Sequence, residues 1–255
     1  MLFGCDGIAG IEFDNFTMTE YICNIALGFI MFYGGFNTKW KTARPVAVKA
    51  VLLSTCGVIL TAAFTMLFCY FVLRFPIAES FLVGAVLSAT DAASVFAILR
   101  RKKLNLKDGV ASLLEIESGS NDPIAYMLTV IGIYILNGDN LIKVPYVIFA
   151  QIVYGVLIGI GLAVAAIYVL TRTDIIVNGL DTIFILAVVL LGLGLSQLVG
   201  GNEFLCIYLF GILLGNSRIR NKGNIVPFFD GVTTLAQIVI SVSYTHLRAH
   251  ETEAD

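Results

Sequence analysis

Charged residues are scarce in this chain of 255 residues. They make up 13% of the sequence, whereas hydrophobic residues make up 58% and the mean hydropathy is +0.90. A water-soluble surface usually carries about 25–35% charged residues, so this composition excludes a soluble globular protein. The sequence therefore predicts a membrane protein, in which each spanning helix needs about 20 apolar residues.

Residues that bind transition metals or carry redox chemistry are also few. The five cysteines have no CxxC or other metal-ligand spacing, and we interpret them as small apolar residues in helices. The two histidines, His246 and His250, are four residues apart near the C-terminus, a spacing that can bind a metal on a helix. The formal net charge of -2 gives no attraction to nucleic acid. No cofactor and no nucleic-acid partner is predicted.

Long apolar runs predict transmembrane helices. The runs long enough to cross about 30 Å of hydrocarbon are 19–36, 46–73, 80–99, 110–136, 146–170 and 182–199. A shorter run at 203–216 follows a Gly-Gly-Asn turn signal, and a last run at 226–242 is cut short by Ser243. The predicted fold class is an all-α membrane protein, a polytopic bundle of about seven full helices and a partial eighth.

Lysine and arginine test this order of helices, because cytoplasmic loops collect them. The first, third, fifth and seventh connections hold 12 of the 16 basic residues: Lys39, Lys41, Arg44, Arg100, Arg101, Lys102, Lys103, Lys107, Arg172, Arg218, Arg220 and Lys222. The intervening connections hold only Arg74 and Lys143. These odd-numbered connections are therefore predicted to face the cytoplasm, and the N-terminal segment to face outside. Since that segment has no basic region of a signal peptide, we expect earlier helices to precede it.

The C-terminal segment 243–255 is abruptly hydrophilic after an apolar run. It resembles translated adapter sequence, and we interpret it as foreign to the rest of the chain rather than as a metal site. The predicted organisation is a partial transmembrane domain at 1–242, followed by this tail.

Glycine is frequent inside the predicted spans. The pairs Gly155/Gly159 and Gly211/Gly215 have the small-xxx-small spacing that lets two helix backbones approach closely. Close helix packing is predicted at both pairs.

Two polar clusters interrupt the apolar spans. The first is SATDAASVF, and the second is SLLEIESGSNDPIAY; their polar residues include Ser88, Thr90, Asp91, Glu115, Glu117, Ser118, Asn121 and Asp122. On a helix, Ser118 and Asp122 share one stripe with Glu115, and Glu117 and Asn121 share the next. A short basic loop joins the two spans, so the clusters are predicted to meet near the middle of the membrane.

The second cluster has the chemistry of a cation site. Ser118, Asn121 and Asp122 offer hydroxyl, amide and carboxylate oxygens over about one helical turn, as hard cations require. Low-dielectric surroundings favour a protonated carboxylate, and a bound cation favours the ionised one. One carboxylate can thus hold a proton or a cation in competition. Pro123 frees carbonyls in the preceding turn, which are either ligands or a kink.

Other interpretations stay open at this point. Polar groups can simply hold helices together, but interhelical hydrogen bonds average only about 0.6 kcal/mol and need no buried acid. A passive channel also selects cations with acidic groups. An intramembrane aspartyl protease pairs two aspartates from neighbouring helices, although its GxGD motif does not occur here.

The two clusters also carry a resemblance. At GAVLSATDAASVF and LLEIESGSNDPIA the chain resembles the monovalent cation:proton antiporter family, in particular the bacterial sodium/proton and potassium/proton exchangers of the NhaP type. FYGGFNTKW at 32–40 and GGNEFLCIYLFGILLGN at 200–216 match it too, so the resemblance covers residues 6 to 240 approximately. It implies a fold of about twelve or thirteen helices with inverted repeats, in which a core bundle moves against a dimerisation bundle. The chain would be a piece of that fold, truncated at both ends.

The resemblance implies roles for six residues: Asp122, Ser118, Thr90, Asp91, Asn121 and Glu117. Asp122 would alternate between proton and cation, with Ser118 as a ligand and Thr90 contributing its backbone or hydroxyl. Asp91 and Asn121 would bridge an unwound helix and its neighbour, and Glu117 would pair with an arginine beyond residue 242. The Asn-Asp pair resembles the branch that exchanges one ion for one proton.

The resemblance also implies partners and a location. The substrates would be Na+ or K+ and H+, and sodium, lithium and potassium exchangers share these motifs. The whole protein would be a homodimer in the lipid bilayer of the bacterial inner membrane. Tyr33 stands where many relatives carry an acid, and we assign it no part in ion binding.

Overall fold

The structure, a computed structural model, describes residues 16–90, 110–138, 141–172, 180–219 and 222–251, with side chains followed as far as Ser243. Within these ranges all regular secondary structure is helical. The helices are α1 Phe16–Asn37, α2 Trp40–Phe71, α3 Ile77–Val86, α5 Val110–Leu136, the short 3-10 helix η2 Leu141–Lys143, α6 Val144–Arg172, α7 Leu180–Leu198, α8 Glu203–Asn216 and α9 Lys222–Glu251.

Most of the predicted spans are confirmed. Helices α5 and α8 have the predicted bounds, and α1, α6 and α7 differ from theirs by a few residues at most. Helix α2 begins at Trp40, six residues before the predicted start at 46, and it carries Pro45 inside. The sequence prediction began after this proline because proline lacks a backbone N–H and disfavours a helix interior.

Two predictions of helix ends are wrong. The run 80–99 does not continue as one helix, since α3 ends at Val86. The hydroxyl of Ser88 donates to the carbonyl of Ala85 at 2.6 Å, and serine side chains compete in this way with the helical hydrogen bonds of the backbone. At the other end, the α9 backbone continues past Ser243 to Glu251. His246 and His250 belong to α9, and their side chains lie outside the described part.

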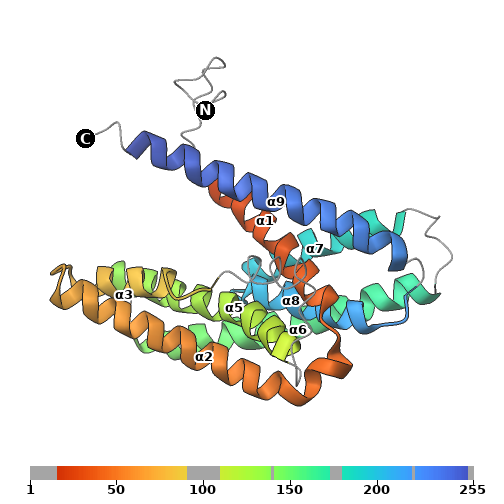
Figure 1. The fold of residues 1–255 in the computed structure, drawn as a ribbon, viewed down its shortest axis with the longest axis horizontal. Coiled ribbons are helices and arrows are strands. Elements are labelled where there is room, and N and C mark those ends of the chain that lie inside the picture. Colours follow the sequence, from red (N-terminus) through yellow and green to blue (C-terminus); the bar gives the residue numbers. More distant parts are fainter. Residues whose placement is uncertain (1–15, 91–109, 139–140, 173–179, 220–221, 252–255) are drawn as a thin grey trace.

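Helix α8 occupies the centre of the molecule. Helices α2, α3 and α5 pack together on one side, α1 and α9 lie on the other, and α8 contacts α1, α6, α7 and α5 (Figure 1). Of the 14 residues of α8, ten are buried. The largest apolar cluster surrounds it and includes Phe32, Ile185, Phe210 and Phe229.

The predicted glycine packing is confirmed at both pairs. A Cβ atom on Gly211 would lie 2.4 Å from the backbone oxygen of Phe32 in α1, and one on Gly215 would lie 2.1 Å from that of Phe36. On the opposite side of α8, a Cβ on Gly159 of α6 would lie 2.6 Å from the backbone oxygen of Cys206. These distances leave no room for a side chain, so the glycines set how closely α1 and α6 approach α8.

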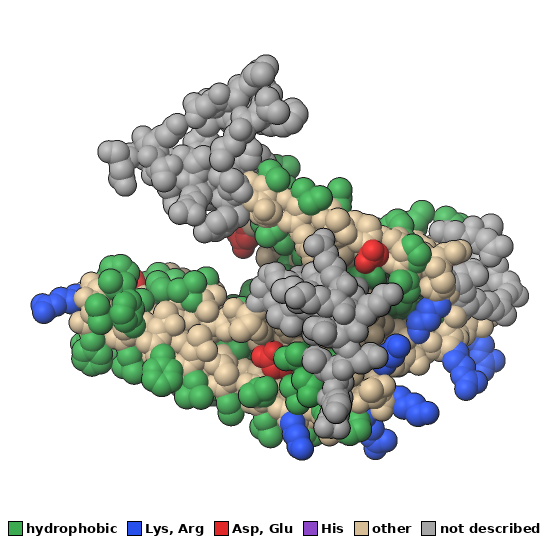
Figure 2. All heavy atoms as spheres, viewed as in Figure 1, with side chains coloured by type: hydrophobic (Ala, Val, Ile, Leu, Met, Phe, Trp, Pro, Cys, Tyr) green, Lys and Arg blue, Asp and Glu red, His purple; other side chains and the backbone are tan. Residues whose placement is uncertain are grey.

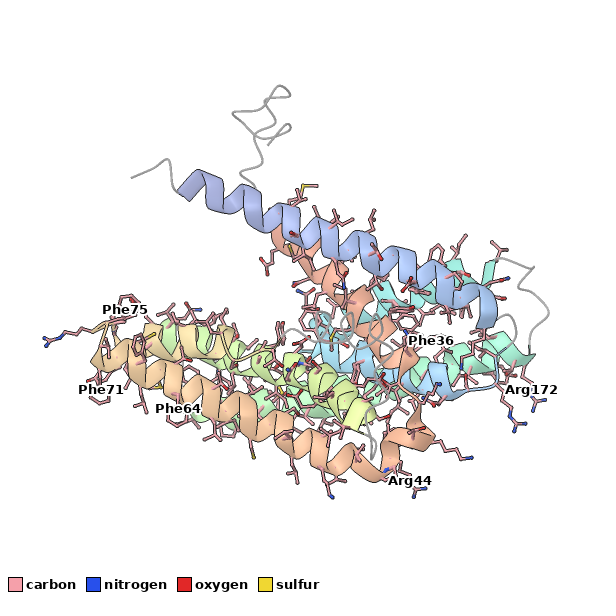
Figure 3. The ribbon with its side chains drawn as sticks, in the orientation of Figure 1. Phe36, Arg44, Phe64, Phe71, Phe75 and Arg172 are labelled. Carbon is pink, nitrogen blue, oxygen red and sulfur yellow. The ribbon has the colours of Figure 1, made fainter. Side chains whose placement is uncertain are left out.

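Basic residues gather at one end of the bundle. Figure 2 shows most of the visible Lys and Arg side chains there, and Figure 3 places Arg44 and Arg172 at that end, opposite Phe71 and Phe75. Asn216, at the end of α8, donates to the carbonyl of Thr38 at 2.8 Å and accepts from the backbone N–H of Trp40 at 2.9 Å. The first, fifth and seventh connections therefore share one end, as the distribution of basic residues predicted. That this end is cytoplasmic stays a prediction.

Among the described residues, four helices are long and apolar enough to cross a membrane: α2, α6, α7 and α9 up to Ser243. Helices α1 and α5 have 22 and 27 residues and carry polar side chains such as Glu20, Asn121 and Asp122. The outer surface of α2 is apolar, with Phe64 70% and Phe71 69% exposed (Figure 3). Such a surface is suited to contact with lipid or with another apolar surface. The chain is a multi-pass membrane protein.

The close contact of α1 with α8 leads to a first prediction. Gly211→Ala places a Cβ against the backbone oxygen of Phe32, and overpacking of this kind costs about 1–3 kcal/mol. We expect a lower thermal unfolding midpoint for the detergent-solubilised protein. The matched control is Gly161→Ala in α6, where a Cβ meets no atom within 4 Å; there alanine should leave the midpoint unchanged or raise it. Equal midpoints for the two variants would contradict the packing argument.

Candidate ion site

The two polar clusters meet, as the sequence predicted. The amide nitrogen Nδ2 of Asn121 in α5 contacts both the hydroxyl and, at 3.4 Å, the carbonyl oxygen of Thr90. Thr90 lies four residues beyond the end of α3, where the backbone has no regular structure. The contact thus joins non-helical chain to the middle of a long helix. Asn121 is fully buried, and its Oδ1 has no hydrogen-bond partner among the described residues.

Helix α5 holds the other predicted site residues. Ser118 is buried with 3% exposure, and Asp122, four residues later on the same stripe, is half-buried. Tyr126 continues this stripe by one more turn and packs edge-on against Phe204 of α8, with the ring centroids 5.0 Å apart. The stripe of Ser118, Asp122 and Tyr126 therefore runs along α5 beside α8.

The remaining predicted residues lie in different surroundings. Asp91 lies outside the described residues, so its bridge to Asn121 stays a prediction. Glu117 and Glu115 are half-buried on α5, and the arginine implied for Glu117 falls beyond residue 242. Tyr33, to which we assigned no ion, donates from its hydroxyl to Asp230 Oδ1 at 2.9 Å and so ties α1 to α9.

Tyr208 of α8 is a site neighbour that sequence reasoning missed. Its ring covers Gly119 so closely that a Cβ there would lie 2.5 Å from two ring carbons and 2.6 Å from the hydroxyl oxygen. The carboxylates of Asp122 and Glu115 are near enough to act on Tyr208 electrostatically. The apolar run at 203–216 does not indicate that Tyr208 faces α5. Helix α8 is buried on nearly all sides, so its sequence has no polar face from which the direction of Tyr208 could be predicted.

Asn202 connects the start of α8 to the site. Its Nδ2 donates to the carbonyl oxygen of Pro123 at 2.8 Å, and its Oδ1 accepts from the backbone N–H of Leu205 at 2.9 Å. The second bond is a helix N-cap, which an asparagine before an apolar run does signal. The first bond joins residues that are 79 positions apart, so no local pattern reveals it. Asn202 thereby fixes α8 against the residue that follows Asp122.

The donors assembled at the site suit a monovalent cation. In the described part of the chain, no three His, Cys, Asp or Glu side chains come together as they would in a transition-metal site. Asp122 instead follows Ser118 by one turn of α5, and its neighbour Asn121 contacts the backbone oxygen and hydroxyl of Thr90. One carboxylate with hydroxyl and carbonyl oxygens can hold a hard, singly charged ion.

Comparisons with known proteins show the family of the chain. The family model described as "Sodium/hydrogen exchanger, transmembrane" matches residues 1–243. The K(+)/H(+) antiporter NhaP2 of Shewanella sp. (strain ANA-3) is 35% identical over 242 residues, 93% of this chain and 42% of that protein. The K(+)/H(+) antiporter NhaP of Alkalimonas amylolytica is also 35% identical over 242 residues, 94% of this chain and 42% of that protein. The chain thus spans less than half the length of these relatives.

More distant matches extend the comparison. The Na(+)/H(+) antiporter NhaS2 of Synechocystis is 25% identical over 235 residues, 88% of this chain and 43% of that protein. The solved sodium proton antiporter MjNhaP1 of Methanocaldococcus jannaschii superposes with a TM-score of 0.74 at 22% identity, covering 90% of this chain and 58% of the other. At that identity the superposition shows a shared fold.

The two hydrogen bonds of Asn202 lead to a second prediction. Asn202→Ala removes the N-cap, worth about 0.5–2 kcal/mol, and the hydrogen bond to the Pro123 carbonyl, worth about 0.5–1.5 kcal/mol. Asn202→Ser keeps a capping oxygen but is too short to reach Pro123. Thermal unfolding should rank the midpoints with Asn202→Ala lowest and Asn202→Ser intermediate. The control Asn137→Ala, at an exposed position after α5, should have the unfolding midpoint of the wild type. A wild-type midpoint for Asn202→Ser would show that the bond to Pro123 contributes nothing to stability.

Proposed function

Because the chain belongs to the sodium/hydrogen exchanger family, we propose that the whole protein exchanges a monovalent cation, Na+ or K+, for protons across the membrane. The observation that carries this proposal is the junction of Asn121 with Thr90, one residue from Asp122 and one turn from Ser118. A secondary transporter needs such a site within the membrane, at a place where helices are interrupted.

Asp122 is the residue at which cation and proton compete in this proposal. A half-buried carboxylate is stabilised by binding either partner, and each partner reduces the affinity for the other. Ser118 adds a neutral ligand, and Thr90 adds its carbonyl or hydroxyl. Asn121, buried and bonded to Thr90, holds the interrupted segment after α3 at the right distance from α5.

Alternating access supplies the transport step. Helices α2, α3 and α5 form one packed group, and α1, α7 and α9 lie across α8 from it (Figure 1). Movement of the first group along α8 would carry Asp122 from one side of the membrane to the other while the site itself stays assembled. The contacts that such a movement must change are the Pro123 bond of Asn202 and the ring of Tyr208 on Gly119.

K+ is our first candidate for the cation. The relatives at 35% identity bear names of K(+)/H(+) antiporters, whereas the Na(+)/H(+) antiporter NhaS2 is 25% identical. We also propose that the whole protein forms a homodimer, as the family resemblance implies. The passive channel and the intramembrane protease differ from the exchanger in measurable ways, and the next experiment separates all three.

Asp122→Asn gives the third prediction. The variant keeps the shape of the side chain but can neither ionise nor take up a proton, so pH-driven exchange should be lost. Vesicles containing the whole protein are loaded with a pH gradient, and an internal pH dye follows the response to external K+ or Na+. The control Glu79→Gln, an exposed acid in the first turn of α3, should exchange like the wild type.

Three results would overturn the proposal. Undiminished exchange by Asp122→Asn would show that another group carries the ion. Cation flux that leaves the pH gradient intact would indicate a passive channel. Cleavage of membrane peptides that depends on Asp122, without any flux, would indicate a protease.

Ser118→Ala provides a fourth prediction, one of affinity rather than rate. If the Ser118 hydroxyl contributes about 1.4 kcal/mol to cation binding, its loss raises the cation concentration for half-maximal exchange about tenfold. The maximal rate should fall much less, because Asp122 remains. The control is Ser120→Ala, two residues away on a different face of α5; an equal effect of both changes would argue against Ser118 as a ligand.

A further inference from the structure

A second carboxylate lies buried close to the proposed ion site. Glu203, the first residue of α8, is only 3% exposed, and its Oε1 has no hydrogen-bond partner among the described residues. An isolated charge buried in this way costs several kcal/mol unless it binds a proton or a cation. The first turn of a helix stabilises a carboxylate in part, but it leaves this oxygen without a specific partner.

Glu203 lines a cavity of about 280 Å³ between α1 and α7. Three other lining residues carry neutral oxygen atoms: Tyr21 and Asn24 from α1, and Gln197 from α7. Leu190 and Leu193 provide an apolar wall, and none of the residues that line the cavity is Lys or Arg. The lining thus includes side chains with carboxylate, amide and phenol oxygens, the kinds of ligand that hard cations take.

The charges that face Glu203 from neighbouring helices are negative or neutral. Glu20 of α1 is near enough to act electrostatically on Glu203, and both act on Tyr126 of α5. On α8 itself the nearest titratable group is the buried thiol of Cys206. The cavity is therefore a place of negative potential, which attracts a cation.

A continuous set of contacts joins this cavity to Asp122. Tyr126 is one turn from Asp122 on α5 and packs against Phe204, the neighbour of Glu203. The Pro123 carbonyl, next to Asp122, accepts from Asn202, the residue before Glu203. Glu203, in the first turn of α8, therefore lies at about the same level along the bundle as Asp122.

We propose that Glu203, with the oxygens of Tyr21, Asn24 and Gln197, forms a second binding site for a monovalent cation near Asp122. The inference rests on the proposed function, since a second cation site has a purpose only in a cation transporter. An ion held there would be linked to Asp122 through Phe204 and Tyr126 and through Asn202 and Pro123, and the site would raise the local cation concentration near Asp122.

The test counts cations bound by the whole purified protein. Radiolabelled K+ and Na+ are titrated onto the detergent-solubilised protein at alkaline pH, where both carboxylates are free of protons. The wild type should bind two ions saturably, and Asp122→Asn should bind one. Asp122→Asn combined with Glu203→Gln should bind none, whereas the combination with the control Glu79→Gln should still bind one.

The results separate this inference from the proposed function. If Asp122→Asn abolishes both exchange and all saturable binding, the second site is overturned while the exchanger stands. If Asp122→Asn retains exchange, the proposed function fails, whatever Glu203 binds. Glu203→Asp keeps the carboxylate, so it should retain the second ion in a protein that elutes as the wild type does. Retention of the second ion by Glu203→Gln would overturn the site. Loss of the second ion in both variants, with unchanged elution, would still support it.

Discussion

The close approach of α8 to its neighbours is the constraint on which the rest of the structure depends. Glycines on α8 and α6 leave no side chain at the points of closest approach, so the backbone of α8 lies directly against α1 at Gly211 and Gly215 and against α6 at Gly159. In lipid there is little hydrophobic gain from bringing apolar helices together, and such contacts stabilise through dispersion and close fit. Because α8 is fixed in depth by these contacts and by an asparagine at each end, it supplies a firm surface for α5. The residues beside Asp122 are positioned by that surface.

Polar groups in this fold are placed where α8 or an interrupted helix can satisfy them. The backbone after Val86 leaves the helical conformation, and Asn121 binds it from α5. The carbonyl of Pro123 accepts a hydrogen bond from Asn202. Because proline has no backbone N–H, it also leaves a carbonyl in the preceding turn without its helical partner. Each polar atom that finds such a partner lowers the cost of keeping α5 within the membrane. Asn121 Oδ1 and Glu203 Oε1 are among the buried polar atoms without a hydrogen-bond partner in the described part of the chain, and a bound cation would stabilise either oxygen.

The sequence predicted the local features of this arrangement and missed those that depend on distant neighbours. Apolar length alone located α5 and α8, glycine spacing located two of the close contacts, and basic residues sorted the connections to one end. The end of α3 at Val86 was missed because apolar residues resume after Ser88, Thr90 and Asp91, so the run 80–99 has the length of one span; the hydroxyl of Ser88 bonds near the observed end. The bond from Asn202 to Pro123, the cover of Tyr208 over Gly119 and the burial of Glu203 all follow from how α8 is seated. The hydrophobic periodicity of a helix that is buried on all sides does not indicate which neighbour each face contacts.

The contacts of α8 with α1 resist displacement more than its contacts with α5 do. Shifting α8 past α1 would push Gly211 and Gly215 out of register with the backbone of Phe32 and Phe36, and a small displacement would bring side chains into a space that holds none. Between α5 and α8, by contrast, the contact consists of one hydrogen bond to Pro123, the Tyr208 ring and the edge-on pair of Tyr126 with Phe204. These are few and can be exchanged for others. These few contacts support the proposal that a group built on α5 slides along α8 while α8, α1 and α6 stay together, so that one site is exposed to two sides in turn.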